Sequence, residues 1–458
     1  MSVLTRSRRT KVLGGFALAA VGALVLAGCS SDGGDAGSTD EAADDSGAAA
    51  VDFPIDCDSQ QPESYEQDFS PTYSDSPGSD DLTYNIGTAL PQTGNLAFLG
   101  PPEIAATEYA AQVINDADKG ITIELTQGDS GDTDNKAYET EVPRILNAGA
   151  TAVVGAASSG VSLQFIDQVI AANAVQMSPA NTSPAFTGYE DNGLYWRTAP
   201  SDTLQGAVLG NQISADGNET LGMIILNDSY GTGLACFTKA AFEDAGGTVV
   251  SAAMYNTGDT NFKSQVEDVM AADPDAIALI TFEEVKTIIP ELTGAGFPSD
   301  KMYLVDGNLS NFGDELPEGT MTGAQGTTPA ADPELTAQFK EDLQAYWTGA
   351  GNDELTDYTY GPESFDAMTL LALAALEAGS TAGPDVAAHL QEVSGGSGDG
   401  EKCTSFADCA DIIIAGGVPD YDGVTGPITF NGAGDPTEAT IGVFKYGEDN
   451  TYEFDHIG

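Results

Sequence analysis

The chain has 458 residues, enough for two or three compact units, and it carries 71 Asp and Glu against 15 Lys and Arg. Four of the basic residues lie in the first 28 residues, which contain no acid, so the remainder has 71 acids, 11 bases and a net charge of −60. This charge repels nucleic acids and anionic lipid surfaces, excludes them as expected partners and favours solubility.

The first 28 residues have the pattern of an export signal. A basic stretch, "RSRRTK", precedes the 16-residue apolar run "VLGGFALAAVGALVLA", which is short for a membrane span of about 20 residues. The sequence "LAGC" resembles the lipobox of bacterial lipoproteins, so we expect lipidation of Cys29 after cleavage. A short membrane anchor with an incidental cysteine is the alternative, and the Arg8–Arg9 pair is compatible with twin-arginine export.

Residues 29–81 are predicted to form an acidic, Ser/Gly-rich tether, because residues 30–81 contain 15 acids and no Lys or Arg. Aromatic residues and a cysteine in its later part predict that this part docks on the folded body; they are Phe53, Cys57, Tyr65, Phe69 and Tyr73. No second apolar span follows, so we expect a protein anchored to the cell membrane at one end and otherwise soluble outside the cytoplasm.

The remaining four cysteines point to two disulfides, since an even number outside the cytoplasm is typical of such bonds. Cys403 and Cys409 are close together in "CTSFADC", and we expect them to pair. This leaves Cys57 and Cys236, whose bond would attach the end of the tether to the body, although this pairing stays open. A zinc site is the competing interpretation, but CxxC is missing and the chain has only two His, so we expect no metal and no cofactor.

From residue 82 onward, near-continuous apolar strands alternate with helical patterns, which is typical of parallel sheets covered by helices. The predicted strands are 82–91, 121–129, 150–160 with a terminal Gly/Ser turn, 175–180, 194–200, 221–228, 248–255 and 276–282. The predicted helices are 101–116, 135–149 with a break, 161–174, 203–214, 234–247, 261–273, 334–347 and 361–379. Residues 426–446 are predicted to end the fold in a β-hairpin-like segment.

Ligands of such sheets bind beyond the carboxyl ends of the strands. The loops at these positions are "QGDSGDTDN", "AASSG", "SPANTSP", "NDSYGTG" and "DGNLSN". They offer backbone N–H groups, hydroxyls, an aromatic ring and an acid. Two of them start helices, where N–H groups favour a carboxylate.

Six segments in order resemble the type I periplasmic binding proteins, and within them the leucine/isoleucine/valine-binding family of ABC importers, over residues 82–447. They are "IGTALPQTGNLAFLGPPEIAATEYAAQVIN", "VVGAASSG", "MSPANTSP", "WRTAPSD", "NDSYGTG" and "GVTGPITFNGAGDPTEATIGVFKY". The resemblance implies an α/β fold with two parallel-sheet lobes joined by a three-crossover hinge. One lobe would comprise 82–200 and 328–412, and the other 201–327 and 413–458.

The resemblance also implies the function and the site. We expect a monomeric, extracytoplasmic solute-binding lipoprotein that captures an amino acid, with branched-chain amino acids as candidates, and delivers it to an ABC permease. The residues that match the family's carboxylate-binding positions are Ser158, Ser159, Ala180 and Thr182. From the other lobe, Tyr230 would pack on the ligand and Asp306 would meet its ammonium group.

Two departures from the family concern the walls of this site. Relatives often carry Tyr near the position of Phe282, which precedes Glu283, so one wall differs and branched side chains are not specified. Asp306 stands where the amino-acid binders have Glu, so its carboxylate is one methylene shorter and contact with the ammonium could pass through water.

Five of the seven site residues also have a simpler structural interpretation. Ser158 and Ser159 are suited to capping the following helix, Thr182 and Asp306 to turn chemistry, and Tyr230 to packing. The segment "DSGDTDN" looks like a calcium loop, but it lacks the glycine and the terminal Glu of an EF-hand, which favours a solvated loop.

Other functions fit the sequence less well. "GTGLAC" lacks the third glycine of a dinucleotide-binding loop, and GxSxG, HExxH and Walker motifs are missing. A secreted hydrolase would have to use His389 or His456, so we expect no enzyme. A ligand sensor that acts through a membrane partner would share the fold and stays open, as do amides, urea-like solutes and short peptides as ligands.

Overall fold

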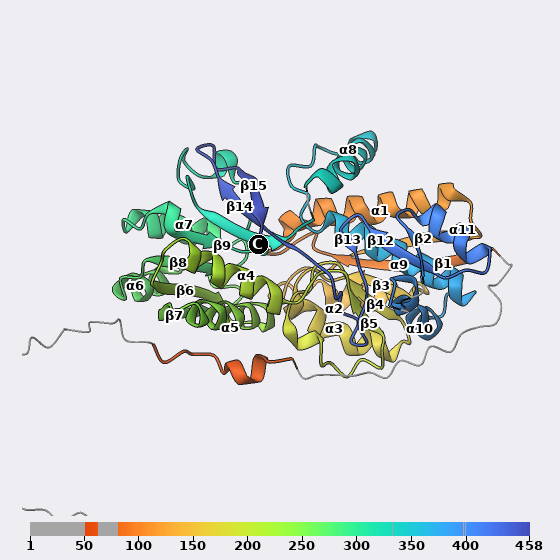
Figure 1. The fold of residues 1–458 in the computed structure, drawn as a ribbon, viewed down its shortest axis with the longest axis horizontal. Helices are drawn as coiled ribbons and strands as arrows, with labels where there is room; N and C mark the ends of the chain where they lie inside the picture. Colours follow the sequence, from red (N-terminus) through yellow and green to blue (C-terminus); the bar gives the residue numbers. More distant parts are fainter. Residues whose placement is uncertain (1–50, 63–80, 332, 397, 399) are drawn as a thin grey trace, which may run out of the picture. The chain divides into compact units, whose positions relative to one another are not determined.

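The computed structural model describes residues 51–62, 81–331, 333–396, 398 and 400–458. They contain two large sheets, each covered by helices (Figure 1). The predicted signal and Cys29 lie outside the described residues, as do Tyr65, Phe69 and Tyr73. Within the described part of the chain, no helix combines the length and apolar character needed to cross a membrane.

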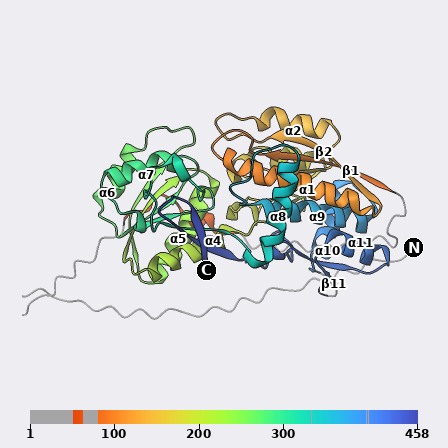
Figure 2. The same ribbon diagram turned by 90° about the horizontal axis from the view of Figure 1, so that it is seen from above.

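The first lobe is built on a parallel sheet of five strands in the order β2-β1-β3-β4-β5. The strands are β1 (Leu82–Leu90), β2 (Ile121–Asp129), β3 (Ala152–Gly155), β4 (Val175–Ser178) and β5 (Tyr195–Arg197). The helices are α1 (Gly100–Ala117), α2 (Tyr138–Asn147), α3 (Ser159–Ala171) and, from later in the chain, α8 (Pro333–Gly349), α9 (Gly361–Ala378), α10 (Gly383–Val393) and α11 (Phe406–Ile414). Helix α9 contacts α1, α10 and α11 and is buried over most of its length, so it is the central helix of this lobe (Figure 2).

The second lobe is built on a sheet of seven strands in the order β15-β14-β10-β9-β8-β6-β7. Strands β6 (Thr220–Leu226), β7 (Thr248–Tyr255), β8 (Ala276–Ile280), β9 (Met302–Leu304) and β10 (Gln325–Pro329) are parallel. Strands β14 (Ile441–Tyr446) and β15 (Tyr452–Ile457) form an antiparallel hairpin at the edge beside β10. The helices are α4 (Asp202–Ala215), α5 (Ser229–Asp244), α6 (Lys263–Ala271) and α7 (Val285–Gly294).

The chain passes between the two sheets three times: from β5 to α4, from β10 to α8, and from β13 to β14. The predicted α/β class with two parallel-sheet lobes is therefore confirmed. A third, small sheet contains β11 (Glu401–Cys403), β12 (Pro419–Gly423) and β13 (Gly426–Pro427).

The last part of the chain differs from the sequence prediction. Tyr421, Ile428 and Phe430 pack in the core of the first lobe with Trp196, so the second lobe resumes at Ile441 and not at residue 413. The hairpin is also shifted: β14 pairs with β15, Gly426 and Pro427 pair with β12, and one isolated bridge joins Phe430 to Pro436. The apolar pattern of "GPITF" predicts burial, but it does not specify which sheet buries it.

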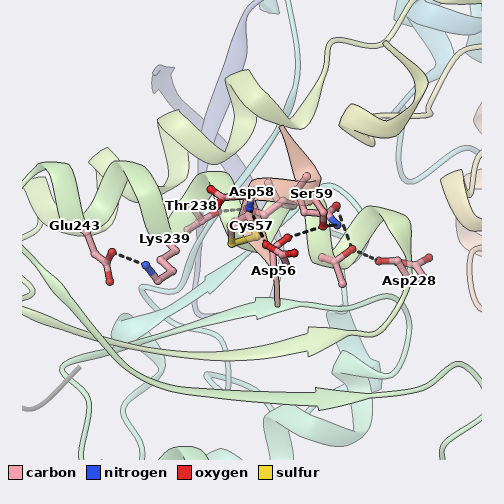
Figure 3. Close-up of a disulfide and its surroundings, with 12 residues drawn as sticks. Asp56, Cys57, Asp58, Ser59, Asp228, Thr238, Lys239 and Glu243 are labelled. Carbon is pink, nitrogen blue, oxygen red and sulfur yellow. Dashed lines mark hydrogen bonds and ion pairs between the residues drawn. A yellow bond between two sulfur atoms is a disulfide. The ribbon is translucent and has the colours of Figure 1, made fainter. Parts of the chain in front are cut away.

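Two disulfides are present: Cys403–Cys409, as predicted, and Cys57–Cys236, whose pairing the sequence left open. Figure 3 shows the Cys57–Cys236 bond joining a short 3₁₀ helix, Cys57–Gln60, to α5. Upstream, the Val51 N–H donates to the Val249 carbonyl at the edge strand β7 (3.2 Å), and Phe53 packs against the core of the second lobe. Residues 51–62 therefore dock on the second lobe, as the aromatic residues of the tether predicted.

Candidate ligand-binding site

A narrow cavity lies where the carboxyl ends of strands from both lobes meet. The first lobe contributes the loops after β1, β3 and β4 and the residue before α9, and the second lobe contributes the loops after β8 and β9 and the start of α5. The lining residues are Leu96, Leu99, Ala157, Ser158, Ser159, Ala180, Tyr230, Phe282, Asp306, Gly307 and Tyr360. The structure thus brings together six of the seven residues predicted from the sequence; the exception is Thr182.

The N-terminus of α3 forms one wall of this cavity. Ser158 is the N-cap, and its Oγ accepts a hydrogen bond from the Val161 N–H (3.3 Å), while Ser159 Oγ accepts one from the Ser183 N–H (3.3 Å). The capping interpretation of Ser158 is therefore correct, and it is compatible with a ligand role because both serines line the cavity. The backbone N–H groups and the dipole at a helix N-terminus favour an anionic ligand group here.

The "SPANTSP" loop after β4 is tied to the loop after β3. Ser178 Oγ donates to the Ala156 carbonyl (2.7 Å), and the Asn181 side-chain amide donates to the carbonyls of Ala156 (3.0 Å) and Ala157 (2.8 Å). Both side chains are fully buried. These bonds make the two loops one rigid wall, and Asn181 is a structural residue that its sequence pattern did not single out.

Arg197, at the end of β5, supports this wall from behind. Its side chain is fully buried; Nε donates to Asp435 Oδ1 (2.6 Å), and Nη1 donates to the carbonyls of Asn181 (3.1 Å) and Ser183 (2.8 Å). A guanidinium can satisfy several acceptors in fixed directions, so one residue holds the turn of the loop and also pairs with a carboxylate 238 positions away.

Thr182 lies behind the cavity and does not line it. The residue is buried, and its carbonyl accepts the N–H of Asp202, the first residue of α4, at 2.7 Å. The Thr182 hydroxyl also lowers the otherwise raised pKa of the Asp202 carboxyl. Thr182 therefore connects the first lobe to the start of the hinge.

The opposite wall is aromatic. The rings of Tyr230, on α5, and Phe282, after β8, stack with centroids 5.1 Å apart and planes inclined by 18°. Gly307 lies against them, and a Cβ atom on it would come within 2.7 Å of the Phe282 ring and 2.9 Å of the Tyr230 oxygen. A side chain at position 307 would therefore displace this wall.

Asp306, directly after β9, is the acid of the cavity, and it is buried. Its carboxylate accepts hydrogen bonds from the hydroxyls of Tyr230 (2.7 Å) and Tyr360 (2.6 Å) and from the side-chain amide of Gln205 (3.0 Å). Burial raises the pKa of Asp306, and these three donors lower it in part. Side chains from three separate elements therefore orient the carboxylate. A residue that served only to form an Asx turn would not need these three donors.

Tyr360 is a lining residue that the sequence did not indicate. It precedes α9 with a left-handed backbone (φ 60°), and its hydroxyl reaches Asp306 across the junction of the lobes. Other direct contacts between the lobes join the Asn95 side chain to Glu284 (3.1 Å) and Ser183 Oγ to the Ser229 carbonyl (2.9 Å). The cavity is thus formed by two lobes in contact.

Asp228 adds a carboxylate at the same junction. Its Oδ1 caps α5 by accepting the Gly231 N–H (2.8 Å), and its Oδ2 lies so close to α3 that a Cβ on Gly160 would be 2.9 Å away. Burial raises the pKa of Asp228 to about 7, although the N–H groups of Gly231 and Tyr230 lower it in part. Burial likewise raises the pKa of Glu363, in the first turn of α9, to about 8.

These raised pKa values predict that the protein is more stable in weak acid. An acid with a raised folded-state pKa contributes stability that is complete below its ordinary pKa and is lost as the pH rises through the raised value. We therefore expect the free energy of unfolding to fall by about 1.4 kcal/mol per pH unit for Asp228 from pH 5 to its pKa of about 7, and by the same slope for Glu363 up to its pKa of about 8. The melting temperature should fall over the same range.

Scanning calorimetry at high salt, which screens the repulsion among surface acids, measures this effect. The variant Asp228→Asn should have a flatter profile than the wild type. A melting temperature that rises from pH 5 to pH 8 would contradict the prediction.

The two histidines do not form a catalytic group at the cavity. His389 is buried in α10 with Nδ1 3.0 Å from Glu392, and His456 lies on β15 beside Asp455. Neither residue lines the cavity. The hydrolase alternative therefore has no histidine at the cavity.

The calcium-like segment after β2 forms a turn that is stabilised by hydrogen bonds from its own backbone to the side chain of Asp132. Asp132 Oδ1 accepts the N–H groups of Asp134 (2.9 Å) and Asn135 (2.7 Å). Among the residues that the structure describes, no group of three or more His, Cys, Asp and Glu is arranged to hold a metal ion.

Comparisons with known proteins agree with this architecture. The sequence model of the periplasmic binding protein family matches residues 83–407. The substrate-binding protein BasB of a chemotactic signal transduction system in Halobacterium salinarum is 27% identical over 366 residues, covering 77% of this chain and 84% of BasB. Leu/Ile/Val-binding protein homolog 3 of Brucella melitensis biotype 1 is 27% identical over 266 residues, covering 57% of this chain and 71% of that protein.

A solved structure has the same fold. LivJ, a branched-chain amino acid transporter substrate-binding protein of Streptococcus pneumoniae in complex with isoleucine, superposes with a TM-score of 0.65 at 19% identity. The match covers 82% of this chain and 99% of LivJ. The resemblance inferred from six short segments is thereby confirmed over most of the folded part. The chain belongs to the periplasmic binding protein family.

Proposed function

We propose that this protein is the extracytoplasmic solute-binding component of an ABC importer, which captures an α-amino acid between its lobes and delivers it to the permease. One observation carries the proposal: a single cavity has the N-terminus of α3 on one side and the buried carboxylate of Asp306 on the other. The helix N-terminus favours a carboxylate and the carboxylate of Asp306 favours an ammonium group, so the two ends of the cavity match the two charges of an amino acid.

The remaining walls favour an apolar side chain. Leu96, Leu99 and Phe282 line the cavity beside the two polar ends. The names of the Brucella and Streptococcus proteins, which refer to Leu, Ile and Val or to isoleucine, support the same class of solute. In this proposal Ser158, Ser159 and Ala180 lie next to the solute carboxylate, with Thr182 behind them.

Calorimetry with matched solutes tests the proposal after native mass spectrometry of gently purified protein has looked for a bound small molecule. L-leucine, L-isoleucine and L-valine should bind, whereas 3-methylbutylamine, which lacks the carboxylate of leucine, and 4-methylpentanoate, which lacks its amino group, should bind far more weakly. Equal binding of leucine and either analogue would contradict the assignment of the two polar ends.

A sensory role is the second candidate. BasB, which matches this chain over most of its length, is described as part of a chemotactic signal transduction system. Uptake of labelled amino acid and movement towards it, compared in cells with and without the gene, distinguish the two roles. Loss of uptake supports transport, and loss of the movement alone supports sensing.

We also propose that Cys29 is lipidated and anchors the protein outside the cytoplasm, because the sequence has the order basic stretch, apolar run, "LAGC". Metabolic labelling with a fatty-acid probe should mark the wild type and leave Cys29→Ala unmarked. Equal labelling of both would end this idea, and full release of the wild type into the medium would contradict the anchor.

A further inference from the structure

Two buried carboxylates interact electrostatically beside the cavity: Asp306, which lines it, and Asp202, which does not. Asp202 is fully buried in the first turn of α4, and Asp306 is 3% exposed. Gln205, three residues after Asp202, donates to Asp306 (3.0 Å) and to the Thr327 carbonyl (3.0 Å) on β10. Residues three apart share a helix face, so Asp202 and Asp306 approach each other at the hinge between the lobes.

The two carboxylates are stabilised unequally. Asp306 accepts from Tyr230, Tyr360 and Gln205. Among the described residues, neither carboxylate oxygen of Asp202 has a hydrogen-bond partner, and the Thr182 hydroxyl nearby lowers the pKa of Asp202 only in part. Burial, and then the charge of Asp306, raise the pKa of Asp202 well above its usual range.

The charged groups around the pair do not neutralise it. Arg197, at the end of β5, lowers the pKa of Asp202 in part, but its guanidinium is already bonded to Asp435. Asp228, from the start of α5, adds a further negative charge. Tyr230 and Tyr360 face Asp306 as neutral donors, because burial raises their own pKa values. Two adjacent carboxylates in such surroundings do not both ionise without a cation.

We infer that Asp202 and Asp306 share one proton in the unliganded protein and that the ammonium group of an arriving solute displaces it, so that binding releases a proton to water. This inference rests on the proposed function. The proton resides mainly on Asp202, because the three donors favour the ionised form of Asp306. Before binding, the pair carries one negative charge. Afterwards, its two negative charges are offset by one ammonium, so the net charge at this end of the cavity is unchanged, while the N-terminus of α3 meets the carboxylate of the solute at the other end.

Calorimetric titration of L-leucine, L-isoleucine and L-valine at one pH, in phosphate and in Tris, measures the proton count, since these buffers differ in ionisation enthalpy. We expect about one proton to be released per solute bound, and the affinity to rise roughly tenfold per pH unit while the pair titrates. Asp202→Asn, which keeps the shape but carries no titrating proton, should bind with the same heat in both buffers and with pH-independent affinity.

The exposed acid Asp116, on α1, offers a matched control, and Asp116→Asn should release the proton as the wild type does. Binding of the wild type without any difference between the buffers, or an Asp202→Asn variant that still releases a proton, would overturn the inference and leave the proposed function intact. Failure of the wild type to bind any of the amino acids would instead refute the proposed function. The buffer comparison on the wild type needs no variant, so a result without proton release overturns the inference even if Asp202→Asn does not fold.

Discussion

Replacing Asp306 by alanine should weaken amino-acid binding by roughly thirtyfold to several thousandfold. A charge-assisted hydrogen bond contributes about 1.5–3 kcal/mol, and leaving the solute ammonium buried without an acceptor raises the loss to about 2–5 kcal/mol. The structure predicts a second loss of free energy in this variant, because the hydroxyls of Tyr230 and Tyr360 would lose their buried acceptor. The same change removes a contact between the lobes, so Asp306→Ala should also close less completely on its solute.

Calorimetry gives the affinity, and small-angle scattering with and without solute gives the closure. Tyr360→Phe is a matched control, since it removes one donor and leaves the carboxylate; its effect should stay near tenfold or less. If Asp306→Ala binds within about threefold of the wild type, which is under 1 kcal/mol, Asp306 is only structural and the solute does not need an amino group.

Replacing Arg197 by methionine should lower the free energy of unfolding by about 3–5 kcal/mol. Methionine has a similar length but no charge, so it leaves Asp435 buried without its partner and removes the donors to the carbonyls of Asn181 and Ser183. These carbonyls belong to the "SPANTSP" loop, so solute affinity should fall as well. Urea denaturation followed by circular dichroism measures the stability.

Arg144 offers a matched control because its ion pair with Glu141 is on the surface, with 49% of the arginine side chain exposed. Arg144→Met should change the free energy of unfolding by under about 1 kcal/mol. The double variant Arg197→Met with Asp435→Leu should recover the part of the loss that comes from the unpaired charge. Equal effects of Arg197→Met and Arg144→Met would show that the buried pair does not support the loop.

The order and type of the early elements could be read from the sequence because the information is local. The strand predicted at 82–91 is β1, Leu82–Leu90, and the one predicted at 121–129 is β2, Ile121–Asp129. Fully buried strands read as apolar runs of strand length, and amphipathic helices repeat every 3.6 residues. Where local signals conflict, the prediction is less accurate: α5 begins at Ser229 and not at residue 234, because the glycines of "SYGTG" disguise its first turn.

The sequence also located most of the candidate site, since ligands of parallel sheets lie beyond the strand ends and the segments there resemble a known family. What only the tertiary structure decided is how distant residues meet. Tyr360 donates to an acid 54 positions away, Arg197 pairs with an acid 238 positions away, and residues 421–430 join the first lobe and not the second. Composition and periodicity determine which residues are buried, whereas the choice of neighbour depends on how the sheets and crossovers pack, and that packing is a property of the whole chain.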